Sequence, residues 1–115
     1  MTTHYCIRPA QLDDIDALVA FTRAEASEAE GLSPDEAAVR RGVEAAFGEP
    51  PRARYWLAET GGRPVGSISV VTEWSNFHGG DYWWVQSLFV VSEHRGTGLV
   101  AQLLDHVTSE ARDAG

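Results

Sequence analysis

Aromatic, β-branched and glycine residues follow one another in a distinct order between Tyr82 and Val107. Residues 82–91 are mostly aromatic or β-branched, which predicts a strand covered on both faces. The sequence Arg95-Gly96-Thr97-Gly98 predicts a turn, because two of its four residues lack a Cβ atom. Apolar residues then recur at helical spacing and predict an amphipathic helix. These residues are Leu99, Val100, Leu103, Leu104, Val107 and Ala111.

The beginning of the chain predicts a strand followed by a helix. The strand covers His4–Arg8 and ends at Pro9. Asp13 and Asp14 suit the N-terminus of the helix, where the helix dipole favours negative charge. The expected buried stripe of this helix is Leu12, Ile15, Leu18, Val19 and Thr22. The helix then runs into an acidic end that contains Glu25, Glu28 and Glu30.

A second helix is predicted to begin at Ser33-Pro34-Asp35-Glu36. Serine is a good N-cap, proline is favoured at the first helical position, and glutamate at the third completes a capping box. The helix is expected to stop at Gly48, before the pair Pro50-Pro51. Its expected buried residues are Val39, Val43, Ala46 and Phe47.

Three strands are predicted to follow. Tyr55–Thr60 and Val65–Trp74 are joined by Gly61-Gly62, which predicts a hairpin. Residues 76–81 form the next turn and lead into the strand at 82–91. The predicted order is therefore β-α-α-β-β-β-α, which places the chain in the α/β (α+β) class.

Length and composition indicate one domain and restrict the classes of partner. With 115 residues and 43% apolar residues, residues 1–115 form a single domain with a modest core. A formal net charge of -8 argues against nucleic acid and favours a cationic substrate. No long apolar run and no signal peptide are visible, so we expect a cytoplasmic protein without a membrane partner. Cys6 is expected in the core, and no metal-ligand spacing is present.

A strand that leads through a glycine turn into a helix predicts an anion site, usually for phosphate. Residues 96–101 satisfy the dinucleotide pattern G-x-G-x-x-A. That motif requires a further strand and an acidic residue about 20 residues later. The given sequence ends at Gly115, so a dinucleotide site is the weaker interpretation.

The segment Ser87–Gly98 resembles the acyl-CoA-binding motif of the GNAT superfamily of N-acyltransferases. Glu73-Trp74-Ser75 and Trp83-Trp84-Val85-Gln86-Ser87 resemble sequences of one bacterial branch of that superfamily. The resemblance implies a mixed, mostly antiparallel sheet flanked by helices, without the usual last strands and helix. It also implies acetyl-CoA as cosubstrate, with no metal, and a small-molecule or peptidyl amine as acceptor.

The resemblance assigns cofactor binding to the turn and to the strand before it. Backbone groups of Arg95, Gly96, Thr97, Gly98, Leu99 and Val100 would hold the pyrophosphate. Leu88, Phe89 and Val90 would bind the pantetheine along the strand. The family usually has glycine or alanine at the position of Val100, whose side chain would either crowd the phosphate or face the core.

Catalytic groups are less clearly indicated. A glutamate that acts as base in some relatives is replaced here by Trp84, which cannot accept a proton. Glu73 is the next candidate, with Gln86 and Asp81 as groups that position water. Trp74 and Trp84 would form a wall of the acceptor pocket, or belong to the core. The family's usual general-acid tyrosine would follow Gly115.

Three functions therefore stay open: an acetyl-CoA-dependent N-acetyltransferase, a catalytically silent acyl-CoA-binding or truncated module, and a nucleotide-binding or interaction domain. Because the last strands are missing, the strand at 82–91 is expected to have an unpaired edge. We expect this edge to be covered in a homodimer, or the chain to be a fragment of a longer gene product.

Overall fold

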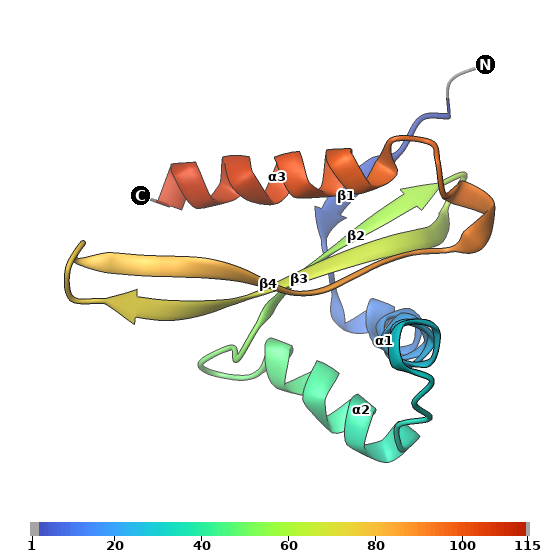
Figure 1. Ribbon diagram of the computed structural model, residues 1–115, viewed down its shortest axis with the longest axis horizontal. Coiled ribbons are helices and arrows are strands. Elements are labelled where there is room, and N and C mark those ends of the chain that lie inside the picture. Colours follow the sequence, from blue (N-terminus) through green and yellow to red (C-terminus); the bar gives the residue numbers. More distant parts are fainter. Residues whose placement is uncertain (1–2, 115) are drawn as a thin grey trace.

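A four-stranded antiparallel sheet separates two layers of helices in the computed structural model, which describes residues 3–114 (Figure 1). The strands are neighbours in chain order: β1 (Cys6–Pro9), β2 (Arg54–Thr60), β3 (Arg63–Ser75) and β4 (Gly80–Val90). The helices are α1 (Ile15–Glu30), α2 (Glu36–Glu44) and α3 (Leu99–Ala114). Short 3-10 turns are η1 (Leu12–Asp14), η2 (Ala45–Phe47) and η3 (Ser92–His94). The predicted fold class and element order are confirmed.

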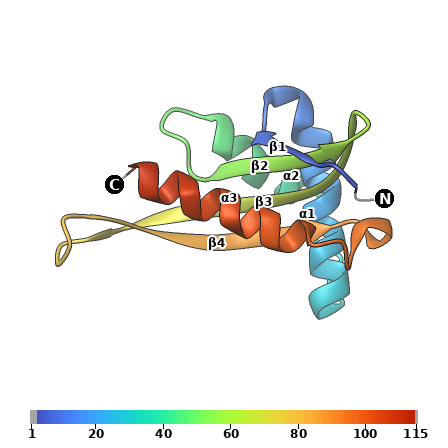
Figure 2. The ribbon, with the colours of Figure 1, turned by 90° about the horizontal axis from the view of Figure 1, so that it is seen from above.

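The sheet has a hydrophobic core on each face (Figures 1 and 2). Successive strand residues point to opposite faces. Trp56 of β2 therefore packs toward α3, together with Ile68, whereas Leu57 packs toward α1 and α2. Leu103 on α3 and Leu18 on α1 are fully buried against these two faces.

The first helix begins later than its apolar spacing predicts. Leu18 and Val19 are buried as expected, and Phe21 joins them. Leu12 was expected in the stripe but is 68% exposed. It lies in the 3-10 turn η1, whose tighter geometry takes it out of the helical register.

The second helix has a different cap from the one predicted. Asp35, not Ser33, is its N-cap, and the Asp35 carboxylate accepts a hydrogen bond from Ala38 N at 3.0 Å. The helix proper begins at Glu36. Its expected buried side chains are only partly confirmed, because Val43 is buried, whereas Val39, Ala46 and Phe47 are half-buried.

The strand β4 lies at an edge of the sheet, so the expected unpaired edge is present in the described chain. The expectation that it is covered on both faces is wrong for its first half. Tyr82, Trp84 and Val85 are exposed there. The hairpin of β3 and β4 extends away from α1 and α2, and its tip also extends beyond α3 (Figures 1 and 2). Cys6, expected in the core, is exposed on the opposite edge strand β1.

One narrow stripe of α3 contacts the sheet. Leu99, Leu103 and Val107 recur every four residues and are buried. Val100 and Leu104 were also expected on the apolar face, but both are exposed. The side chain of Val100 therefore does not face the core.

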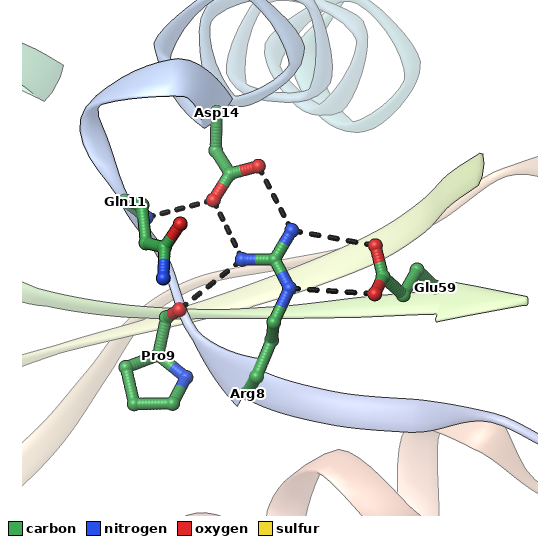
Figure 3. Close-up of polar contacts among 5 residues, drawn as sticks. All are labelled: Arg8, Pro9, Gln11, Asp14 and Glu59. Carbon is green, nitrogen blue, oxygen red and sulfur yellow. Dashed lines mark hydrogen bonds and ion pairs between the residues drawn. The ribbon is translucent and has the colours of Figure 1, made fainter. Parts of the chain in front are cut away.

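Arg8 links the first strand, the turn η1 and the second strand (Figure 3). Its guanidinium donates two hydrogen bonds to the Asp14 carboxylate, at 2.8 and 3.1 Å, and also contacts Glu59 at 3.3 Å. Gln11 N donates to the same Asp14 carboxylate at 2.7 Å. The hydrogen bonds from Arg8 lower the pKa of Asp14, and those to Asp14 and Glu59 raise the pKa of Arg8.

We expect Asp14→Asn to lower the free energy of unfolding at pH 7 by about 2 kcal/mol, because it breaks a charged, buried hydrogen-bond pair. The folded-state pKa of Asp14 lies below its ordinary value of 3.8. The stability that the ionised Asp14 contributes to the folded protein is therefore complete above pH 3.8 and is lost as the pH falls through the folded-state pKa. The difference between wild type and variant should shrink below about pH 4.

Urea denaturation at pH 7 and pH 3 measures both effects. Asp13→Asn is the matched control, because Asp13 is an exposed carboxylate in the same turn. It should change the free energy of unfolding by less than about 0.5 kcal/mol. An Asp14→Asn effect that is equally large at both pH values would contradict this account.

Candidate functional site

The glycine turn between η3 and α3 has the backbone shape that the sequence predicts. Gly96 and Gly98 have φ angles of 77° and 86°, which side chains with a Cβ atom rarely adopt. The hydrogen bond from Gln102 N to Gly98 O, at 3.1 Å, opens α3. The amide groups that precede Gln102 in the first turn therefore lack helical acceptors. Free amides of this kind, together with the helix dipole, are the groups with which a helix N-terminus can hold an anion.

Tyr5 supports this turn from the N-terminal segment. Its buried hydroxyl lies 2.8 Å from His94 Nδ1 and donates to Thr97 Oγ1 at 2.9 Å. Thr97 Oγ1 in turn donates to His94 O at 2.7 Å. The turn is thus fixed to the beginning of the chain, a role for Tyr5 that no sequence pattern indicates.

The side chain of Arg95 makes its contacts with other parts of the protein. It forms an ion pair with Glu28 of α1 at 2.7 Å, and its Nε donates to Val90 O at 2.9 Å. The guanidinium also lies over the ring of Phe89, 5.5 Å from its centroid. The turn therefore offers an anion its backbone amides, while the Arg95 side chain holds the turn against α1 and β4.

The side chains of the last β4 residues point alternately into the two cores, and some of their backbone groups point to the open edge. The side chains of Leu88 and Val90 pack in the core beneath α3, and Phe89 stacks on Phe21 of α1 at 5.3 Å. Peptide groups of alternate residues point to the same side of an antiparallel strand. Leu88 N–H points to the open edge, where it donates to the carboxylate of Glu25 at 3.1 Å. Val90 O points to the same edge and accepts from Arg95.

A β-bulge lies directly before this segment. Ser69 of β3 pairs with Ser87, but the next residue, Val70, pairs with Val85, so Gln86 is the additional residue. The bulge shifts the alternation of the residues before it by one. It therefore decides which side chains of the hairpin face α1 and α2.

A cavity of about 490 Å³ opens between α1, α2, β2 and β4, beside the bulge. We call it the α1–α2 cavity. Its polar lining includes Thr22, Glu25, Glu30, Tyr55, Gln86 and Ser87. Burial raises the pKa of Tyr55, and the neighbouring Ser69 and Thr22 hydroxyls oppose this shift. The cavity thus offers carboxylates and a protonated phenol next to the edge of β4.

The predicted catalytic and substrate residues do not all meet. Gln86 lines the α1–α2 cavity, whereas Glu73 lies on the exposed hairpin and accepts a hydrogen bond from Trp84 Nε1 at 3.3 Å. Trp84 and Glu73 share the sheet face of α1 and α2. Trp74 lies on the opposite face, in register with Asp81. The structure therefore pairs Glu73 with Trp84 but separates both from Trp74. Glu25, which the sequence indicates only as one of three glutamates at the acidic end of the first helix, is the carboxylate beside the edge of β4.

Within residues 3–114, no group of three metal-ligating side chains is found. No helix in that range is long and apolar enough to cross a membrane.

Comparison with known proteins identifies the family. The model of the acetyltransferase (GNAT) family matches residues 15–115. The chain belongs to this family. No curated protein matches the sequence. GNAT proteins use acetyl-CoA as acyl donor, so the expectation of an acyltransferase is confirmed at the level of the family.

Solved structures show the same fold. An integron cassette protein from the mobile metagenome of Cole Harbour Salt Marsh is 32% identical, with a TM-score of 0.87. The match covers 95% of this chain and 71% of that one. A possible acetyltransferase from Clostridium difficile 630 is 29% identical, with a TM-score of 0.86, over 91% of this chain and 69% of that one. A predicted acetyltransferase with acetyl-CoA from Clostridium acetobutylicum is 19% identical, with a TM-score of 0.77, over 96% and 75% of the two chains.

Proposed function

We propose that the protein is an N-acetyltransferase that transfers the acetyl group of acetyl-CoA to a primary amine by direct attack. The observation that carries the proposal is the glycine turn at the start of α3, which lies beside the open edge of β4 in a GNAT fold. The backbone amides of residues 95–100 bind the pyrophosphate. The edge of β4 from Leu88 to Val90 binds the pantetheine. The solved relative with acetyl-CoA supports this choice of cosubstrate.

In the reaction, a C–N bond forms to the acyl carbon and the C–S bond of the thioester breaks. The amine must be uncharged to attack. Deprotonating an alkylammonium with a pKa near 10.4 costs roughly 4–5 kcal/mol at pH 7, so a relay to water is useful. Gln86 positions such a water in the α1–α2 cavity. Glu73, paired with Trp84 on the hairpin, is the more remote proton acceptor of the proposal.

Gly98→Ala is expected to weaken binding of acetyl-CoA and CoA at least about tenfold. The substitution distorts the turn, and each backbone amide that moves away from the phosphate loses a hydrogen bond to a charged group. Gly98 has a φ of 86°, and alanine is strained there by about 1 kcal/mol. An added Cβ would meet no other atom, so strain in the turn is the main effect. Isothermal titration calorimetry with acetyl-CoA, CoA and NAD measures the affinities.

Gly79→Ala is the matched control, because Gly79 also has a positive φ, 64°, and free space around it, but lies in the hairpin turn before β4. It should lose similar stability and keep its affinity for CoA. Equal CoA affinity in wild type and Gly98→Ala would refute the assignment of the turn. Binding of NAD in preference to CoA would favour a nucleotide-binding domain.

Thiol release from acetyl-CoA is expected to depend on added amine. A panel of alkylamines, amino acids and peptides tests the acceptor with a thiol-reactive dye. The sequence contains no lysine, so acetylation of the protein's own side-chain amines does not add to the signal. The exposed Cys6 contributes a constant background, which Cys6→Ser removes. Binding of acetyl-CoA without release for any amine would identify a catalytically silent module.

We further propose a homodimer through the part of the open edge of β4 that precedes the bulge at Gln86, which the pantetheine does not use. Beside this edge, Tyr82, Trp84 and Val85 are exposed, as are Val100 and Leu104 on α3. Covering such a surface removes apolar area from water. It also gives hydrogen-bond partners to the unpaired backbone groups of an aggregation-prone edge strand. Light scattering at low micromolar concentration should give twice the mass of 12.5 kDa. A monomer with full acetyl transfer would show that the dimer is not needed.

A further inference from the structure

We infer that Tyr5 positions the glycine turn for its anion through a closed network of three hydrogen bonds with His94 and Thr97. We call these three residues the Tyr5 network. The inference rests on the proposed function and extends it, because it adds a positioning residue from the N-terminal segment to a site made of backbone amides. It also determines which nitrogen of the His94 imidazole carries a hydrogen.

The glycine turn needs support from outside its own backbone. Gly96 and Gly98 lack the Cβ atom that restricts other residues, so the unsupported backbone can adopt many other shapes. Thr97 lies between them and carries the only side chain of these three residues. Its hydroxyl donates to His94 O at 2.7 Å and accepts from the Tyr5 hydroxyl at 2.9 Å. The middle of the turn is therefore held through the oxygen atom of one side chain.

Only one arrangement of hydrogens satisfies all three contacts. The carbonyl oxygen of His94 can only accept, so the single hydrogen of the Thr97 hydroxyl is donated to it. Thr97 Oγ1 then accepts the single hydrogen of the Tyr5 hydroxyl. The Tyr5 oxygen lies 2.8 Å from His94 Nδ1 and has no second hydrogen, so Nδ1–H donates to it. The neutral His94 is therefore the Nδ1–H tautomer, and a proton added at Nε2 leaves all three hydrogen bonds in place.

Tyr5 is a well-fixed anchor for this network. Its side chain is buried and belongs to the core beneath α3. Its ring meets the His94 imidazole edge to face, with centroids 5.6 Å apart. Water therefore does not readily replace the Tyr5 hydroxyl as a partner of Thr97 and His94. An anion at the turn binds more tightly, because the amides that receive it are already ordered.

Isothermal titration calorimetry with CoA tests the positioning role. Tyr5→Phe keeps the packed ring and removes the hydroxyl, and we expect the affinity for CoA to fall about threefold to tenfold. Thr97→Val should have the same effect, because valine has the shape of threonine without its hydroxyl. Thr97→Ser restores a hydroxyl and should recover the affinity that Thr97→Val loses. Since both losses break one network, the double variant Tyr5→Phe/Thr97→Val should bind CoA within about twofold of the weaker single variant.

Thr60→Val is the matched control. The Thr60 hydroxyl donates its hydrogen to His4 O at 2.9 Å, so it holds the same segment before β1 but gives no hydrogen to the turn. Its removal should leave the affinity for CoA within about twofold of the wild type. A loss as large as that of Tyr5→Phe would show a general loosening of the N-terminal segment, and would overturn the positioning role.

NMR spectra that correlate the imidazole nitrogens with the ring hydrogens give a readout that packing alone does not change. The sequence contains four histidines, and His94→Asn identifies the signals of His94 by their loss. In the neutral imidazole of the wild type we expect a hydrogen on Nδ1 and none on Nε2. In Tyr5→Phe this preference should be lost, because Nδ1–H no longer has the Tyr5 oxygen as its acceptor.

The proposed function and this inference fail in different ways. A wild type that does not bind CoA overturns the proposed function, and the positioning role with it. A wild type that binds CoA, with equal affinity in Tyr5→Phe and Thr97→Val, overturns the inference alone. So does a neutral His94 that carries its hydrogen on Nε2, because the network then lacks one of its three hydrogens.

Discussion

The open edge of β4 is the constraint on which the site depends. A strand at the edge of a sheet presents N–H and C=O groups that need partners. Glu25 and Arg95 supply side-chain partners for two of these groups, Leu88 N–H and Val90 C=O. Because Arg95 also pairs with Glu28, the same contacts place α1, the glycine turn and the strand relative to one another. The same side-chain contacts therefore hold both the glycine turn and the α1–α2 cavity in place.

The order of elements and the glycine turn could be predicted from the sequence because both are local. A period of two or 3.6 residues and a pair of glycines are visible within a few positions. The same local signal misplaced Leu12, Val100 and Leu104, because spacing does not tell how much of a helix its neighbours cover. At the second helix, Ser33 and Asp35 are both good caps, and local preference does not choose between them.

The candidate site could be predicted only in its backbone part. Glu25 contacts a strand residue 63 positions away through a side chain and a main-chain amide, a contact that leaves no pattern in either segment. The tryptophans were hard to place for a different reason. One additional residue at Gln86 reverses the alternation of the strand before it, which turns Trp84 toward Glu73 and Trp83 toward the core beneath α3. A bulge is a feature of pairing, and the sequence of one strand does not reveal it.

The hydrogen bonds of Tyr5 couple the beginning of the chain to the glycine turn. Tyr5 immediately precedes β1 and holds two residues at the glycine turn, 89 and 92 positions later. Any ligand that requires the turn in this shape therefore also favours the docked first strand, and binding free energy is shared with the folding of the N-terminus. Docking of the first strand and binding of such a ligand are therefore coupled equilibria.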